Sequence, residues 1–207
     1  MHKFVQLLIA FILVAVVCGR HLTCDSVVQL KFFKISQFEG LENRLMCVIQ
    51  DEDISSSDNL TLSGRHINGS FTHIDVVSFV GGHMTKLPRV FDESTNQEIV
   101  QVLLANTKTS ALNAQFFAPQ SGGSVIHLII MHDGSQKKVA MSVESLAFRN
   151  FVSLETLMLN NKKITFIAPD AFVGLHKLAY LALVDIKLET IQPEWFGELG
   201  GLQLILT

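Results

Sequence analysis

The sequence predicts a repeat solenoid, in which similar units of about 25 residues stack side by side and share one hydrophobic core. Blocks rich in Phe and Leu recur at a fixed spacing, and a strand-like alternation of apolar residues follows each block. Hydrophobic residues make up 48% of the 207 residues and charged residues 17%, which excludes a disordered chain.

The repeat is clearest in the second half of the chain. The block Phe148–Leu154 recurs as Phe172–Leu178 and as Phe196–Leu202, at a spacing of 24 residues each time. The pattern Leu-x-x-Leu-x-Leu begins at the last residue of the first block and again at the last residue of the second. Weaker copies extend toward the amino terminus. The predicted units start at Ile74, Ile99, Val125, Leu154 and Leu178, with an incomplete unit from Leu202.

Each unit contains one short strand whose side chains alternate between two faces. We therefore expect Leu157 and Leu159 to enter the core and Met158 to point outward. Three Phe residues recur at one level of the repeat and should stack as an aromatic spine, which accounts for the 15 Phe residues against one Trp and one Tyr. The residues of this predicted spine are Phe148, Phe172 and Phe196.

The pattern L-x-x-L-x-L, followed by an apolar pair, a Pro and a Phe, resembles the extracellular leucine-rich repeat. The resemblance covers residues 71–207, and residues 20–70 look like the amino-terminal cap of that family. It implies an α/β solenoid: a horseshoe with short parallel strands on the concave side, an irregular or short-helical convex side and a disulfide in the cap. The chain departs from the family where Asn is usual after the strand. It has Gly82, Thr107, Asp133, Lys162 and Ile186 at these places.

Residues 1–19 have the layout of a secretory signal peptide, with a basic start, an apolar run and a small residue before the cleavage point. The alternative is a membrane anchor, but the apolar run is shorter than the roughly 20 residues that a span needs. Cleavage leaves two cysteines, Cys24 and Cys47, which we expect to form one disulfide in an oxidising compartment. Two buried free thiols are the alternative. Acceptor sequons at Asn59 and Asn68 also favour a secreted glycoprotein.

The sequence stops within an apolar strand pattern, Leu202–Thr207, without a polar cap or a cysteine cluster. This favours a truncated gene product. The alternative is self-association through the uncapped carboxyl-terminal repeat, because an uncovered apolar edge pairs readily with another chain.

The sequence shows no constellation of residues that would support catalysis. There is no H-E-x-x-H, C-x-x-C or G-x-S-x-G motif, and the eight His residues are scattered without carboxylates or thiols at ligand spacing. The net charge of −3 and the lack of a basic cluster argue against nucleic acid as a partner. We therefore expect no enzyme activity, no cofactor and no metal. No stretch after residue 19 is long and apolar enough to span a membrane.

The remaining candidate site is the concave surface of the predicted strands. Its centre is apolar, and exposed apolar patches tend to mark contact sites. The alternative is a shallow unused face, or burial of these residues because the register is off by one. The predicted ligand-binding residues are Leu103, Ile129 and Met158 in the centre, His127 and Tyr180 beside them, and His132 and Asn161 on the far side.

These observations favour a secreted, non-catalytic module that binds another extracellular protein. The chain is similar to secreted leucine-rich repeat proteins of insects, including the immune group of mosquitoes, and this resemblance implies innate-immune recognition or complex formation. The coiled-coil tail and extra cysteines of many of those proteins are lacking here. The alternatives are the amino-terminal fragment of a cell-surface receptor or adhesion ectodomain of the Toll-like kind, and a secreted enzyme.

Overall fold

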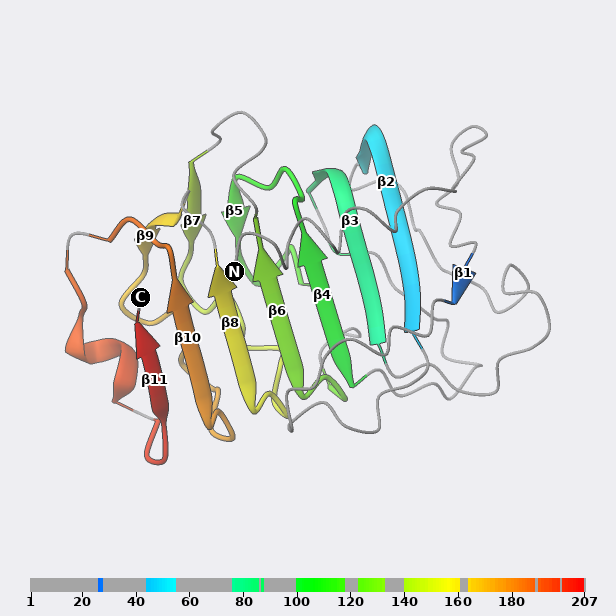
Figure 1. Ribbon diagram of the computed structural model, residues 1–207. Coiled ribbons are helices and arrows are strands. Elements are labelled where there is room, and N and C mark those ends of the chain that lie inside the picture. The colour runs from blue at the N-terminus through cyan, green and yellow to red at the C-terminus, as the bar shows by residue number, and fades with distance from the viewer. Residues whose placement is uncertain are drawn as a thin grey trace.

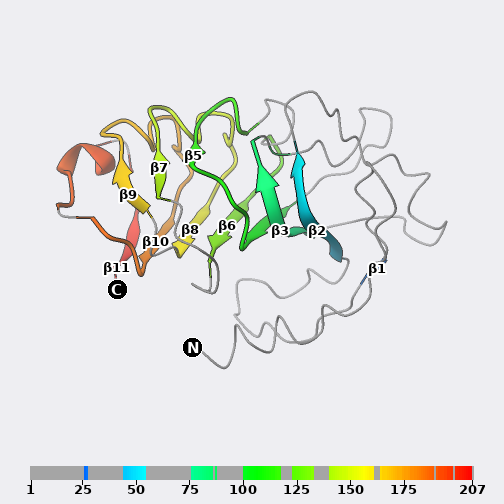
Figure 2. The same ribbon diagram turned by 90° about the horizontal axis from the view of Figure 1, so that it is seen from above.

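The computed structural model describes residues 26–27, 44–54, 76–85, 87, 100–117, 123–132, 140–160, 164–188, 190–197 and 199–206. These form two β-sheets on opposite sides of a shared core, as Figures 1 and 2 show from two directions. The long sheet has eight strands in the order β1-β2-β3-β4-β6-β8-β10-β11, and the short sheet has three in the order β5-β7-β9.

The strands of the long sheet are β1 (Ser26–Val27), β2 (Arg44–Ile54), β3 (Val76–Met84), β4 (Gln101–Ala105), β6 (His127–Met131), β8 (Thr156–Asn160), β10 (Tyr180–Val184) and β11 (Gln203–Leu206). Those of the short sheet are β5 (Ala111–Leu112), β7 (Met141–Val143) and β9 (Ile164–Ile167).

From β4 to β10 the chain alternates between the long sheet and the short sheet, so that each turn of the solenoid contributes one strand to each side. Neighbouring strands in both sheets run parallel, except that β1 pairs antiparallel with β2. A parallel sheet needs long crossover connections between its strands. Here the opposite side of each turn supplies them, and the predicted parallel solenoid is confirmed.

The strand register agrees with the sequence alignment through five strands. Leu157 of β8 lies beside Leu128 of β6 and Leu181 of β10, as the recurring pattern predicts. The last strand differs by one residue, because Leu181 pairs with Leu204, whereas a constant spacing of 24 would place Ile205 there. A shift of one residue exchanges the two faces of a strand, so the expected alignment of this last unit needed correction.

Burial follows the alternation expected for strands with one face in a core. Leu157 and Leu159 are fully buried, whereas Met158 between them is only half-buried, so the prediction for this strand is confirmed. The same positions of the other strands supply the rest of this wall of the core: Val77, Phe79, Val102, Leu104, Leu128, Ile130, Leu181 and Leu183.

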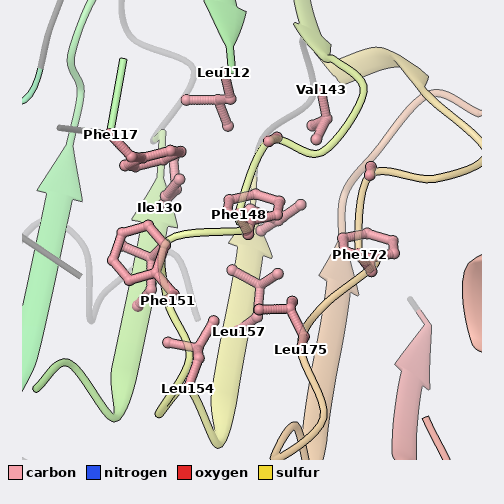
Figure 3. Packing of buried hydrophobic residues seen from close by; sticks show 14 of the residues in the cluster. Leu112, Phe117, Ile130, Val143, Phe148, Phe151, Leu154, Leu157, Phe172 and Leu175 are labelled. Carbon is pink, nitrogen blue, oxygen red and sulfur yellow. The ribbon is translucent and has the colours of Figure 1, made fainter. Parts of the chain in front are cut away.

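Aromatic rings fill the space between the two sheets. Phe148 and Phe172 are stacked, with ring centroids 5.9 Å apart and an angle of 5° between the planes. The ring of Phe117 lies on the other side of Phe148, at a centroid distance of 5.5 Å (Figure 3). The predicted third member was wrong: Trp195, not Phe196, contacts Phe172, edge to face at 6.3 Å.

The side opposite the long sheet is made of short strands and turns. Among the described residues, its helical structure is the single 3-10 turn η3 (Pro193–Phe196), which begins with a Pro at its first position. Pro is favoured there because its missing N–H would be unpaired in any case. This side is therefore irregular with one short helical turn, as expected, and in the described ranges the solenoid is nearly all β.

The predicted disulfide cap lies largely outside the described residues. Cys24 is one of the residues outside them, and so are the sequons at Asn59 and Asn68 and the whole of residues 1–19. Cys47 lies in β2, with its Cα opposite that of Phe79, whose side chain is fully buried. The Cys24–Cys47 pairing therefore stays a prediction, as do the boundaries of the three regions.

Candidate functional site

The long sheet has one face in the core and an outer face turned away from it. The strands β4, β6, β8 and β10 lie side by side in the long sheet (Figure 1). We use "outer face" for the positions of these four strands whose side chains point away from the core. The register aligns these positions into three rows that cross the strands. The polar row is Gln101, His127, Thr156 and Tyr180; the apolar row is Leu103, Ile129, Met158 and Ala182; and the third row is Ala105, Met131, Asn160 and Val184.

The apolar row contains the three residues predicted for the centre of the binding surface. Leu103 pairs with Ile129, and Ile129 with Met158, so the structure brings these side chains together in consecutive strands. Ala182 continues the row on β10. All four are half-buried, so that each keeps part of its apolar surface accessible while resting on its neighbours. A continuous and partly accessible apolar stripe results.

The polar row runs alongside this stripe and includes the predicted residues His127 and Tyr180. Both are half-buried. Gln101, which pairs with His127, is only 7% exposed, and its side-chain oxygen Oε1 accepts no hydrogen bond. Thr156 lies between His127 and Tyr180. Each strand therefore places a hydrogen-bonding side chain at the same level of the outer face.

The electrostatic character of the outer face is neutral. None of its three rows contains Asp, Glu, Lys or Arg. Burial lowers the pKa of His127 below its ordinary value of 6.5, while the nearby carboxylate of Glu155 acts in the opposite direction. His127 is therefore uncharged at neutral pH. The cores of protein interfaces are depleted in charged residues in the same way.

The far side of the surface differs from the expectation. His132 follows the last residue of β6 and is 9% exposed, so its ring offers little surface to a ligand. The outward positions at this level are those one residue earlier, including Met131 and Asn160, because side-chain direction alternates along a strand. Asn161 lies outside the described residues.

The residues just after the strand pairing have a backbone role instead. Gly81, Asn106 and Asp185, at equivalent places in their repeats, have positive φ angles of 78°, 57° and 54°. Gly adopts this left-handed conformation freely, and Asn and Asp adopt it more readily than other residues. Asn106 and Asp185 follow the last residues of β4 and β10 and turn the chain out of the sheet, whereas Gly81 lies within β3, which continues to Met84.

Polar side chains elsewhere hold neighbouring turns together. The amide of Asn150 donates hydrogen bonds to the carbonyl oxygens of Ala114 at 3.3 Å and Phe117 at 2.8 Å. Ser145 donates to the carboxylate of Asp170 at 2.6 Å.

Within the part of the chain that the structure describes, no three His, Cys, Asp or Glu side chains come together as metal ligands would. No helix in the described ranges is long and apolar enough to cross a membrane.

Two comparisons bear on this arrangement. The family model described as leucine rich repeat matches residues 141–185 and, in an overlapping match, residues 152–206. This family match and the solenoid fold together support a leucine-rich repeat protein. The matched residues include β8 and β10, and with them Met158, Tyr180 and Ala182 of the outer face. A search of curated proteins gave no match.

Leucine-rich repeat domains generally mediate contacts between proteins, and their solenoid typically serves as a scaffold without catalysis. Sequence reasoning found the apolar centre of the outer face because the period of the repeat fixes it. It missed the third row, since the far side was assigned one residue too late. The alternation of side chains along each strand was the signal that could have found Met131 and Asn160.

Proposed function

We propose that this chain is a secreted, non-catalytic protein-binding module and that the outer face contacts its partner. The observation that carries the proposal is the half-buried apolar row, Leu103, Ile129, Met158 and Ala182, bordered by uncharged polar side chains. Covering apolar surface releases roughly 25 cal/mol per Å². Rows without charges avoid the desolvation that a buried ion would cost.

The test places a carboxylate in the middle of the row. Met158→Asp and Ile129→Asp should each weaken binding of the partner by about 2–4 kcal/mol, as substitutions at central interface residues do. Val152→Asp is the matched control, because Val152 is 58% exposed and lies in a turn, outside the three rows of the outer face. All three variants should still fold, since the changed side chains are not part of the buried core.

Partners are identified by crosslinking the purified protein in the extracellular fluid in which it occurs, followed by mass spectrometry. A partner crosslinked to the wild type and to Val152→Asp, but not to either outer-face variant, supports the proposal. Binding that is unchanged in both outer-face variants contradicts it.

Secretion is proposed from the sequence of residues 1–19. Expression in cultured eukaryotic cells should deliver the protein to the medium, with an amino terminus that begins after Gly19. A glycosidase should lower its apparent mass, and the Asn59→Gln and Asn68→Gln variants should remove that change. Retention in the cell with an intact leader would contradict secretion.

The narrower role that we propose is recognition or complex formation in innate immunity, and its support is the resemblance to secreted insect leucine-rich repeat proteins. Depletion of the protein in the animal that makes it should raise the microbial load after infection. An unchanged load would contradict the immune role and would leave the binding function intact.

A further inference from the structure

We infer that the partner presents an amphipathic α-helix to the outer face, with the axis of the helix running across the strands. This inference rests on the proposed function, because it concerns the same surface. It adds the class of structure that the surface recognises and the direction in which that structure lies.

The direction follows from how side chains are distributed on the strands. Along each strand the outer face changes from a polar side chain to an apolar one, and on β8, where Thr156, Met158 and Asn160 follow one another, it becomes polar again. On the other three strands the third row is apolar and widens the stripe. Across the strands it stays apolar, from Leu103 on β4 to Ala182 on β10. The apolar stripe of an amphipathic helix runs along its axis. The two stripes overlap along their length only when the helix crosses the strands, which lie side by side in Figure 1.

The spacing of the strands also suits a helix. Neighbouring strands lie about 4.8 Å apart, so the three intervals of the apolar row span about 14 Å. Positions i, i+3, i+7 and i+10 of an α-helix fall at about 0, 4.5, 10.5 and 15 Å along its axis. One apolar side chain of the helix can therefore meet each side chain of the row.

Other chain conformations fit the row less well. In an extended chain, side chains on one face recur about every 6.7 Å, so four of them span about 20 Å. A polyproline II helix has turns of about 9.3 Å and would meet every second residue of the row. Of the three conformations, only the α-helix spaces its side chains so that one of them meets each of the four residues of the apolar row.

The polar row would lie along one side of the bound helix, and its chemistry indicates which side chains the helix should carry there. Thr156 and Tyr180, both half-buried, carry hydroxyl groups whose oxygens accept hydrogen bonds. Glu155 is exposed directly before β8, and its carboxylate adds a negative charge near His127 of the row. Acceptors beside a carboxylate favour donors on the partner. The helix should carry Lys, Arg or Gln on the flank that faces the polar row.

The test uses two displayed peptide libraries of equal composition, selected for binding to the full secreted chain. In one, peptides of about 16 residues carry varied apolar residues at i, i+3, i+7 and i+10 among helix-forming residues. In the other, the apolar residues alternate with polar ones, as in an extended strand. The helical library should yield binders whose affinity falls about tenfold or more when a Pro is placed at the centre of the peptide.

The same binders should lose about tenfold or more in affinity with Met158→Asp or Ile129→Asp and keep their affinity for Val152→Asp. Met158→Gln serves as a milder second variant, and each protein is used after the fluorescence of its buried Trp195 is shown to match the wild type. If the alternating library alone yields binders that depend on Met158, the helix inference falls and the proposed function stands. If neither library yields binders that depend on the outer face, the helix inference falls, and crosslinking with Met158→Asp and Ile129→Asp decides the proposed function.

Discussion

Truncation of Phe148 to Ala should weaken the solenoid more than any substitution on its surface. The ring is fully buried between the two sheets. It is stacked on Phe172 and also lies within 5.5 Å of Phe117 and 6.5 Å of Phe151, measured between ring centroids. Its removal therefore opens a cavity that three other rings line, in the middle of a core that every turn shares.

The expected magnitude follows from the size of the ring and from its contacts. Phe→Ala at a fully buried position costs about 3–5 kcal/mol, which is a large share of the roughly 5–15 kcal/mol that stabilises a typical domain. Phe148→Leu keeps most of the volume and loses the ring contacts, so we expect about 1–2 kcal/mol. A double-mutant cycle with Phe172→Leu should give a coupling energy of about 0.5–1.5 kcal/mol.

Urea unfolding provides the assay, because the single Trp of the chain reports on the core. Trp195 is 3% exposed and contacts Phe172, so its emission should shift when the spine opens. The control is Val152→Ala, which changes an exposed side chain and should stay within about 0.5 kcal/mol of the wild type. A loss below about 1 kcal/mol for Phe148→Ala would refute the aromatic spine as a source of stability.

Three further predictions concern other parts of the chain. Asn150→Ala removes the donor to the carbonyl of Phe117 and should lower the free energy of unfolding by about 1–3 kcal/mol in urea titrations, with Asn150→Asp at least as harmful. Burial lowers the pKa of His127 in the folded state, so the unfolded chain binds the proton first. Stability should therefore fall as the pH drops below about 6.5, and a His127→Gln variant should lose less over this range; an identical pH profile would contradict this. Mass spectrometry of the non-reduced protein should show peptides linked through Cys24 and Cys47, and free thiols at both positions would contradict the disulfide.

Much of the fold could be predicted because burial imposes a period on the sequence. Leu157 and Leu181 had to be large and apolar, since each fills the same place in successive turns, and the structure pairs them. The outer position of Met158 followed from the same alternation. The buried Leu residues on either side thus determined which residues of each strand point outward and form the centre of the candidate site. No chemical signature of their own marked them.

The misassigned residues lie where the period is interrupted. Ala171 and Phe172 are both buried, and one repeat later Trp195 takes the place of the small Ala. The larger indole occupies the core and leaves Phe196 half-buried. A count of 24 residues could not reveal this exchange of volume between adjacent positions.

The shift at β11 had a visible signal. Leu204 is in register with Leu181, and the chain has Leu at every second residue from 202 to 206. That alternation indicates which residues share a face, independently of the distance from the previous repeat. The local pattern was therefore a better guide to register than the repeat length.

Each strand of the long sheet is hydrogen-bonded to its immediate neighbours in the sheet, so a repeat can be added without changing the contacts of distant strands. A tandem duplication of residues 154–177 would insert one more turn of the solenoid between β8 and β10. Its copies of Leu157, Leu159 and Phe172 would match the equivalent residues of the turns on both sides. The outer face would widen by about 4.8 Å, one strand spacing, and the apolar row would gain a second Met. Such a lengthened protein offers a way to vary the reach of the surface without redesigning its interior.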